Sequence, residues 1–163
     1  MTDITYTNKA TEKKAAQGLA AGKGEGGSVK ALVVSTIEVP ASSANDTVRL
    51  GTIPSNARIL PTGLIANDDL ATTGSPTLDI GFGSVDSNIT SDPDALINGI
   101  ALSSATSTTT VMSDVANAGK YAWEFVSGQT TDPGGVLDVY ATIADAATDT
   151  VGTLSVELYG YFD

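Results

Sequence analysis

The side chains best suited to chemistry lie in an acidic loop at positions 86–94. Oxygen-bearing side chains recur there at alternate positions: Asp86, Asn88, Thr90, Asp92 and Asp94. Calcium takes about six to eight oxygen ligands, and alternation directs the oxygens of one loop inward. The helix–loop–helix calcium loop, however, requires a glycine and a glutamate where this chain has Ser91 and Ile97. We therefore interpret the loop as an Asx-rich surface turn and assign it no metal.

The remaining carboxylates are also interpreted as parts of turns. Asn67–Asp69, and Asp145 with Asp149, stand among turn-forming residues, where solvated acids are common. Glycoside hydrolysis needs two acids facing each other across a cleft, one of them with a raised pKa. Glu124 lies among aromatic residues, but strand alternation would point it away from them. We expect no catalysis.

The aromatic residues Tyr121, Trp123 and Phe125 alternate in a segment, 120–126, that predicts a strand. On an outer face they could stack on sugar rings, but inward-facing aromatic residues in a strand are ordinary core. We interpret them as core, and we expect Tyr140, Tyr159 and Tyr161 to extend the same cluster or its rim.

Two residue types are missing from the chain, and their absence narrows its chemistry. It contains no histidine, so the usual general base and the commonest transition-metal ligand are lacking. It contains no cysteine, so disulfides and thiolate metal sites are excluded. We expect no catalytic, cofactor-binding or metal-binding residues.

Most of the chain reads as short strands separated by Gly, Pro, Asn and Asp. The predicted strands are 30–39, 46–53, 57–60, 62–66, 77–82, 97–102, 108–112, 120–126, 136–143 and 151–162, the last in a central position. Single helical turns are expected at 94–98 and 113–117. This pattern predicts an all-β fold, an antiparallel jelly-roll-like β-sandwich, with an immunoglobulin-like sandwich as the alternative.

Residues 1–28 differ from this β-rich body, which spans 29–163. They are rich in Gly and Ala and carry four of the eight basic residues: Lys9, Lys13, Lys14 and Lys23. The segment has fair helix propensity up to residue 21, but it has no apolar face to bury. We expect an extended, flexible N-terminal arm, either without a role or serving as a tether that orders on a partner.

The net charge constrains the partners. A formal charge of −11 opposes binding to nucleic acids and to anionic membranes, because both require clustered Lys and Arg. No signal peptide or membrane-spanning stretch is visible. We expect a soluble protein made in a cytoplasm.

Four segments of the chain resemble a known class of protein. They are the Gly/Lys arm, residues 48–60 with residues 68–81, and Ala-Trp-Glu-Phe at 122–125. Together they resemble small virion structural proteins of tailed bacteriophages, of the head decoration (cement) type. In such proteins a strand ending in Leu-Gly-x-Ile-Pro leads through a turn to a second, inward-facing strand.

The resemblance implies a β-sandwich, often trimeric, on the outer surface of the phage head. Such a unit binds the major capsid protein and stabilises the head by bridging neighbouring subunits, while its arm reaches along the shell. The protein would be synthesised in the bacterial host cytoplasm and reside in the virion. The alternative is a carbohydrate- or receptor-binding module of a tail or head fibre.

Overall fold

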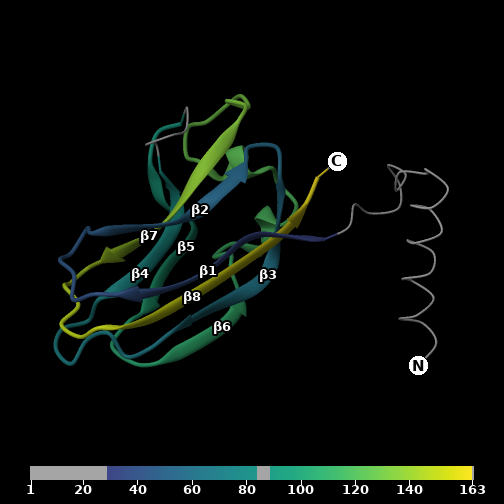
Figure 1. Ribbon diagram of the computed structural model, residues 1–163. Helices are drawn as coiled ribbons and strands as arrows, with labels where there is room; N and C mark the ends of the chain where they lie inside the picture. The colour runs from purple at the N-terminus through teal and green to yellow at the C-terminus, as the bar shows by residue number, and fades with distance from the viewer. Residues whose placement is uncertain (1–28, 84–88, 163) are drawn as a thin grey trace, which may run out of the picture.

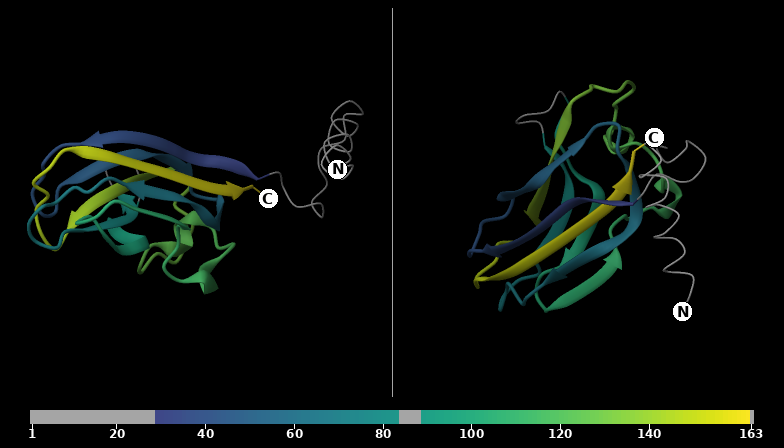
Figure 2. Two further views of the ribbon diagram at one scale, coloured as in Figure 1. Left: turned by 90° about the horizontal axis from the view of Figure 1, so that it is seen from below. Right: turned by 45° about the vertical axis from the view of Figure 1, so that its right-hand side comes forward.

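The computed structural model describes residues 29–83 and 89–162, which form two four-stranded antiparallel sheets packed face to face (Figure 1). The strands are β1 (Lys30–Val39), β2 (Thr47–Pro54), β3 (Arg58–Asn67), β4 (Thr77–Gly83), β5 (Asp92–Ala101), β6 (Thr106–Thr110), β7 (Val136–Ala144) and β8 (Gly152–Tyr161). Sheet A has the order β1-β8-β3-β6 and sheet B the order β2-β7-β4-β5. The left view of Figure 2 shows the two layers from the side.

The strand order is that of a jelly roll. The pairs β1–β8, β2–β7, β3–β6 and β4–β5 nest inside one another, so the chain resembles one long hairpin rolled into two sheets. This arrangement confirms the predicted jelly-roll-like sandwich. The immunoglobulin alternative is wrong, because that fold does not pair its strands in this nested order.

Strand β8 holds sheet A together from its centre. It pairs with β1 on one side and with β3 on the other, which confirms the central position predicted for the last strand. Its inward residues Leu154, Val156 and Leu158 are buried, and the residues between them are more exposed. This alternation places one face of β8 in the core and the other in solvent.

The core fills the space between the sheets with branched aliphatic side chains. Sheet B contributes the fully buried residues Leu78, Ile80 and Phe82 from β4, and β7 adds Leu137 and Val139. Because these residues alternate with outward-facing ones, the period-two pattern of the sequence was sufficient to predict both strands.

Strand β3 is continuous where two short strands were expected. Residues 57–60 and 62–66 belong to one strand, and Pro61 lies within it. The pairing with β8 shifts its register between Ile59 and Gly63, and the Pro61 carbonyl accepts a hydrogen bond from Val111 N at 3.0 Å. A strand irregularity of this kind accommodates a proline.

The helical turn expected at 94–98 is wrong, because these residues belong to β5. Ile97 pairs with Ile80 of β4, and burial of Leu96 and Ile97 outweighs the weak local helix propensity. The turn expected at 113–117 is confirmed by a short 3₁₀ helix, η1 (Val115–Asn117), where Asp114 accepts a hydrogen bond from Ala116 N.

The strand predicted at 120–126 is also wrong. Residues Ala122–Phe125 form a 3₁₀ helix, η2, and Glu124 Oε2 accepts a hydrogen bond from Tyr121 N at 2.7 Å. Backbone hydrogen bonds from Ala122 and Trp123 attach the segment to the turn between β2 and β3. A local side-chain-to-backbone bond thus replaces strand pairing. No helix in residues 29–83 and 89–162 is long and apolar enough to cross a membrane.

The interpretation of the aromatic residues as core is confirmed for two of them. Trp123 and Phe125 are partly buried and pack against the core, whereas Tyr121 lies over Arg58, with 3.9 Å between the guanidinium carbon and the ring centroid. Glu124 is exposed, as expected, although capping rather than strand alternation keeps it there.

Strands β8 and β3 approach so closely at Gly160 that the position should tolerate no larger residue. A Cβ at this position would lie 2.2 Å from the carbonyl oxygen of Arg58, so Gly160→Ala must displace backbone. We expect this substitution to lower the free energy of unfolding by about 1–3 kcal/mol, measured by denaturant unfolding.

Gly51→Ala is the matched control. Its Cβ would meet only Val33 side-chain atoms, at 3.6 Å, an ordinary contact. Equal destabilisation by the two substitutions would contradict the close approach of β3 and β8.

Candidate interaction surfaces

The four arm lysines Lys9, Lys13, Lys14 and Lys23 lie outside the described residues, as do Asp86 and Asn88 of the acidic loop. Their predicted roles therefore rest on sequence alone. The other acids of that loop, Asp92 and Asp94, belong to β5.

Asp92 and Asp94 are engaged in structural hydrogen bonds. Asp92 accepts a hydrogen bond from Ser127 N at 2.6 Å, and Asp94 accepts one from Asn98 Nδ2 at 2.8 Å. Burial and the neighbouring Asp94 carboxyl raise the pKa of Asp92. Across the described parts of the chain, no group of three or more acidic side chains is placed to hold a metal ion.

The loops at one end of the sandwich are held by their own carboxylates. Asp149 accepts hydrogen bonds from the backbone N–H and the hydroxyl of both Thr72 and Thr73. These bonds lower the pKa of Asp149 from 3.8 to about 2. Asp68 accepts a hydrogen bond from Thr153 N at 2.8 Å, and Asp145 accepts one from the Thr77 hydroxyl at 2.7 Å. The interpretation of these acids as parts of turns is confirmed.

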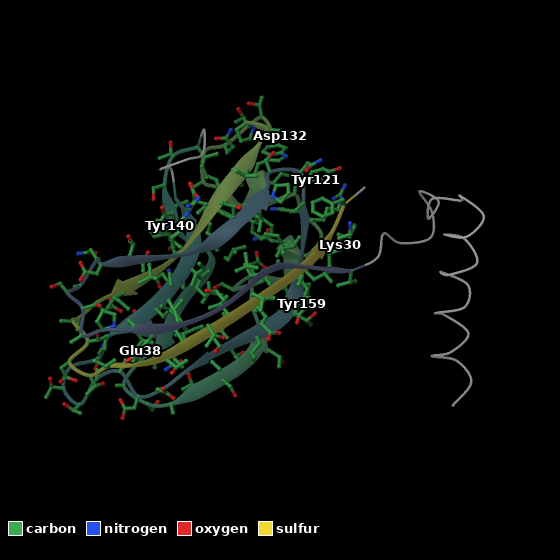
Figure 3. All side chains as sticks on the ribbon, in the orientation of Figure 1. Lys30, Glu38, Tyr121, Asp132, Tyr140 and Tyr159 are labelled. Carbon is green, nitrogen blue, oxygen red and sulfur yellow. The ribbon has the colours of Figure 1, made fainter. Side chains whose placement is uncertain are left out.

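The two ends of the sandwich differ in charge. At one end, the loops 40–46, 68–76, 102–105 and 145–151 carry five aspartates and no Lys or Arg, with Glu38 beside them. At the other end, where β1 begins and β8 stops, the cations Lys30, Arg58 and Lys120 lie among the acids Asp114, Glu124 and Asp132, so the charges there nearly balance. Figure 3 shows Lys30 and Tyr121 at this end and Glu38 at the opposite end.

An uncharged groove of about 410 Å³ lies between the edge strands β5 and β6. Ile97, Ile100 and Met112 form its apolar part, and Thr106 and Thr108 belong to its hydroxyl-rich wall. Strand β6 contains only Thr and Ser and pairs with β3; within the described residues, no strand pairs with its other edge. Such an edge can accept an added strand.

A second hollow lies on the outer face of sheet B. The outward positions of β4 include Gly81 and Gly83, and the absence of side chains lets other groups approach. A Cβ at Gly81 would lie 2.1 Å from the Asp92 carbonyl oxygen, and one at Gly83 would lie 2.2 Å from the ring of Tyr140. The start of β5 and the Tyr140 ring therefore lie directly against β4 and border a pocket of about 310 Å³.

One residue that lines the pocket has a buried polar atom without a partner. Thr142, on β7, is only 8% exposed, and its Oγ1 has no hydrogen-bond partner in the described part of the chain. Buried hydroxyls are normally satisfied, so this one requires an explanation. In contrast, the fully buried carboxylate of Asp138 on the same strand forms an ion pair with Arg49.

The sequence analysis missed this pocket and misplaced two tyrosines. Tyr140 and Tyr159 do not extend the aromatic cluster of residues 121–125: Tyr140 borders the pocket, and the Tyr159 hydroxyl donates to Glu157 on the outer face of sheet A. The available signal was glycine at alternate positions of β4, since glycine in a strand often marks a close approach by another group.

The fold defines the chain as a jelly-roll β-sandwich, and a search of solved structures found one of the same kind. It is described as the cyanophage Pam1 capsid asymmetric unit, and it contains a chain that matches with 20% sequence identity and a TM-score of 0.56. The match covers 88% of this chain and 91% of that chain. No protein-family model matches the sequence, and no curated protein matches it.

The hydrogen bonds to Asp149 predict an acid-dependent contribution to stability. Because its folded pKa, about 2, is below the ordinary 3.8, the contribution is complete above pH 4 and is lost as the pH falls toward 2. Carboxyl NMR titration should give a midpoint of about 2. Asp149→Asn should be less stable than the wild type at pH 7, and the difference should shrink below pH 4.

Asp132→Asn serves as the control for this experiment, because the Asp132 carboxylate accepts one hydrogen bond, from Gly134 N at 2.8 Å, where Asp149 accepts four. An Asp149 midpoint at or above 3.8 would show that the four bonds are absent in solution.

The unpartnered hydroxyl of Thr142 predicts a stabilising substitution. Thr142→Val removes that hydroxyl with little change in shape, so the free energy of unfolding should rise by about 1 kcal/mol. Thr148→Val is the matched control, since Thr148 is also buried but its Oγ1 accepts a hydrogen bond from Ser42 N at 2.9 Å. That substitution should destabilise by about 1 kcal/mol. Denaturant unfolding of both variants checks the opposite signs.

Proposed function

We propose that this protein is a capsid decoration (cement) protein of a tailed bacteriophage. It binds the outer surface of the head and stabilises the shell by bridging neighbouring capsid subunits. The observation that carries the proposal is the jelly-roll fold shared, over most of both chains, with a chain of a cyanophage capsid asymmetric unit. Jelly rolls are frequent in viral capsid proteins.

The use of the carboxylates supports a structural role over a catalytic one. Asp68, Asp145 and Asp149 hold turns, and Asp92 ties β5 to residue 127. Catalysis by carboxyl groups needs acids that converge on a substrate cleft. The acids named here instead stiffen loops and strand ends, which suits a rigid unit that works by adhesion.

Two parts of the chain provide the contacts with the major capsid protein. The lysines at 9, 13, 14 and 23 pair with acidic patches on the shell, while an extended segment of a capsid subunit adds to the uncharged edge of β6. Each contact is weak, and their linkage gives firm attachment. A homotrimer multiplies the contacts again. The charge of −11 argues against nucleic acid and membranes as partners.

Cosedimentation of the full-length protein with expanded phage heads tests both contacts. Replacing Lys9, Lys13, Lys14 and Lys23 together by Gln should weaken binding at least about tenfold, because several surface ion pairs are lost. Lys30→Gln with Lys120→Gln removes positive charge from the body and should leave binding nearly unchanged.

Thr109→Lys tests the β6 edge on the same heads. A charged side chain on an edge strand opposes the addition of another strand, so binding should weaken by about tenfold. Thr36→Lys, on the opposite edge strand β1, is the control. A wild-type chain that does not sediment with heads overturns the proposed function; normal binding by both the quadruple-lysine variant and Thr109→Lys overturns only the assigned contacts.

A further inference from the structure

The pocket on the outer face of sheet B is separate from the groove between β5 and β6. Residues from β2, β4, β5 and β7 and the loops beside them border it: Asn45, Thr47, Gly83, Ser91, Pro93 and Tyr140, with Phe82 and Thr142. Thr47 pairs with Thr142 across β2 and β7, so their side chains are neighbours on the same face. The groove at β5 and β6 is lined by other residues, so the two hollows are distinct.

The lining residues indicate which kind of ligand the pocket can hold. The lining combines apolar surface from Tyr140 and Pro93 with hydroxyl and amide groups, and none of the lining side chains that the structure describes is Asp, Glu, Lys or Arg. Arg49, which lies opposite Tyr140 on β2, forms an ion pair with Asp138, so an anionic ligand would find no unpaired cation among the described lining residues and would approach a protein of net charge −11. A purely apolar ligand would leave the buried Thr142 hydroxyl without a partner.

We propose that this pocket binds a neutral saccharide. A pyranose ring has an apolar C–H face, which the Tyr140 ring can cover, and a rim of hydroxyl groups that can satisfy Thr142, Thr47 and Asn45. The volume of about 310 Å³ is near the lower end of the range of small-molecule sites, roughly 300–1,000 Å³, which suits one or two sugar rings.

This site is independent of the capsid contacts. The proposed attachment uses the arm and the β6 edge, so the outer face of sheet B is free to meet another surface. A decorated particle would thereby display many copies of a weak sugar site, and multivalency would make their combined binding strong. The sequence analysis considered sugar stacking on the aromatic residues at 121–125. The proposed site instead places carbohydrate binding at Tyr140.

NMR titration of the isotope-labelled full-length protein tests the proposal. The ligands are glucose, galactose, mannose, N-acetylglucosamine and their neutral disaccharides, with galacturonic acid and sialic acid as charged counterparts. At least one neutral sugar should cause saturable shifts at residues 45–47, 91–93 and 140–142. The acidic sugars should bind at least about tenfold more weakly, because the described lining residues include no cation.

Two substitutions and one control locate the binding. Thr142→Val should weaken the sugar about tenfold by removing one buried hydrogen bond, although the fold is retained. Tyr140→Leu should weaken it further by removing the ring face, and Thr109→Val, on β6, should leave it unchanged. Absence of saturable shifts with every neutral sugar overturns the proposal, as does equal affinity in Thr142→Val and wild type. Sedimentation with phage heads does not depend on either result.

Discussion

The pairing of β8 between β1 and β3 is the interaction on which the rest of the structure depends. Strand β8 joins β1 to β3 in sheet A, and its inward side chains Leu154, Val156 and Leu158 are buried in the core. These partners are about a hundred residues apart in the chain, and closing such long loops carries an entropic cost that burial must offset. The β1–β8 pair is the outermost of the nested pairs of the jelly roll, which also include β2–β7, β3–β6 and β4–β5.

Close packing of strands explains where the chain uses glycine. Gly160 lets β8 approach β3, and Gly81 and Gly83 let the start of β5 and the Tyr140 ring lie against β4. The close approaches at Gly81 and Gly83 also form the border of the pocket on sheet B. The two β4 glycines therefore serve both the packing of sheet B and the shape of the proposed binding pocket. A side chain added at either glycine would clash with the start of β5 or with the Tyr140 ring.

The two ends of the sandwich differ in charge, so they can be told apart by a binding partner. The loops at one end contain aspartates whose carboxylates accept hydrogen bonds from backbone N–H groups and so restrict the conformations of the turns. The end where β1 begins carries basic and acidic residues in near balance, and two of its cations lie over aromatic rings: Arg58 over Tyr121 and Lys30 over Phe162. Between them, β6 presents an uncharged edge. A stiff body with distinct ends suits a protein proposed to attach to a shell in one orientation.

The sequence by itself determined the all-β class, the bounds of most strands, the central place of the last strand and the use of acids in turns. These features follow from local pattern: alternation of apolar residues, and turn residues between the runs. It misjudged 94–98 and 120–126, because pairing with β4 in one case and the Tyr121–Glu124 hydrogen bond in the other outweighed local propensity. Only the tertiary structure decided the pocket around Tyr140 and Thr142 and the groove beside β6. Their residues come from strands far apart in the chain, and no local pattern records which outward side chains the rolled sheets bring together.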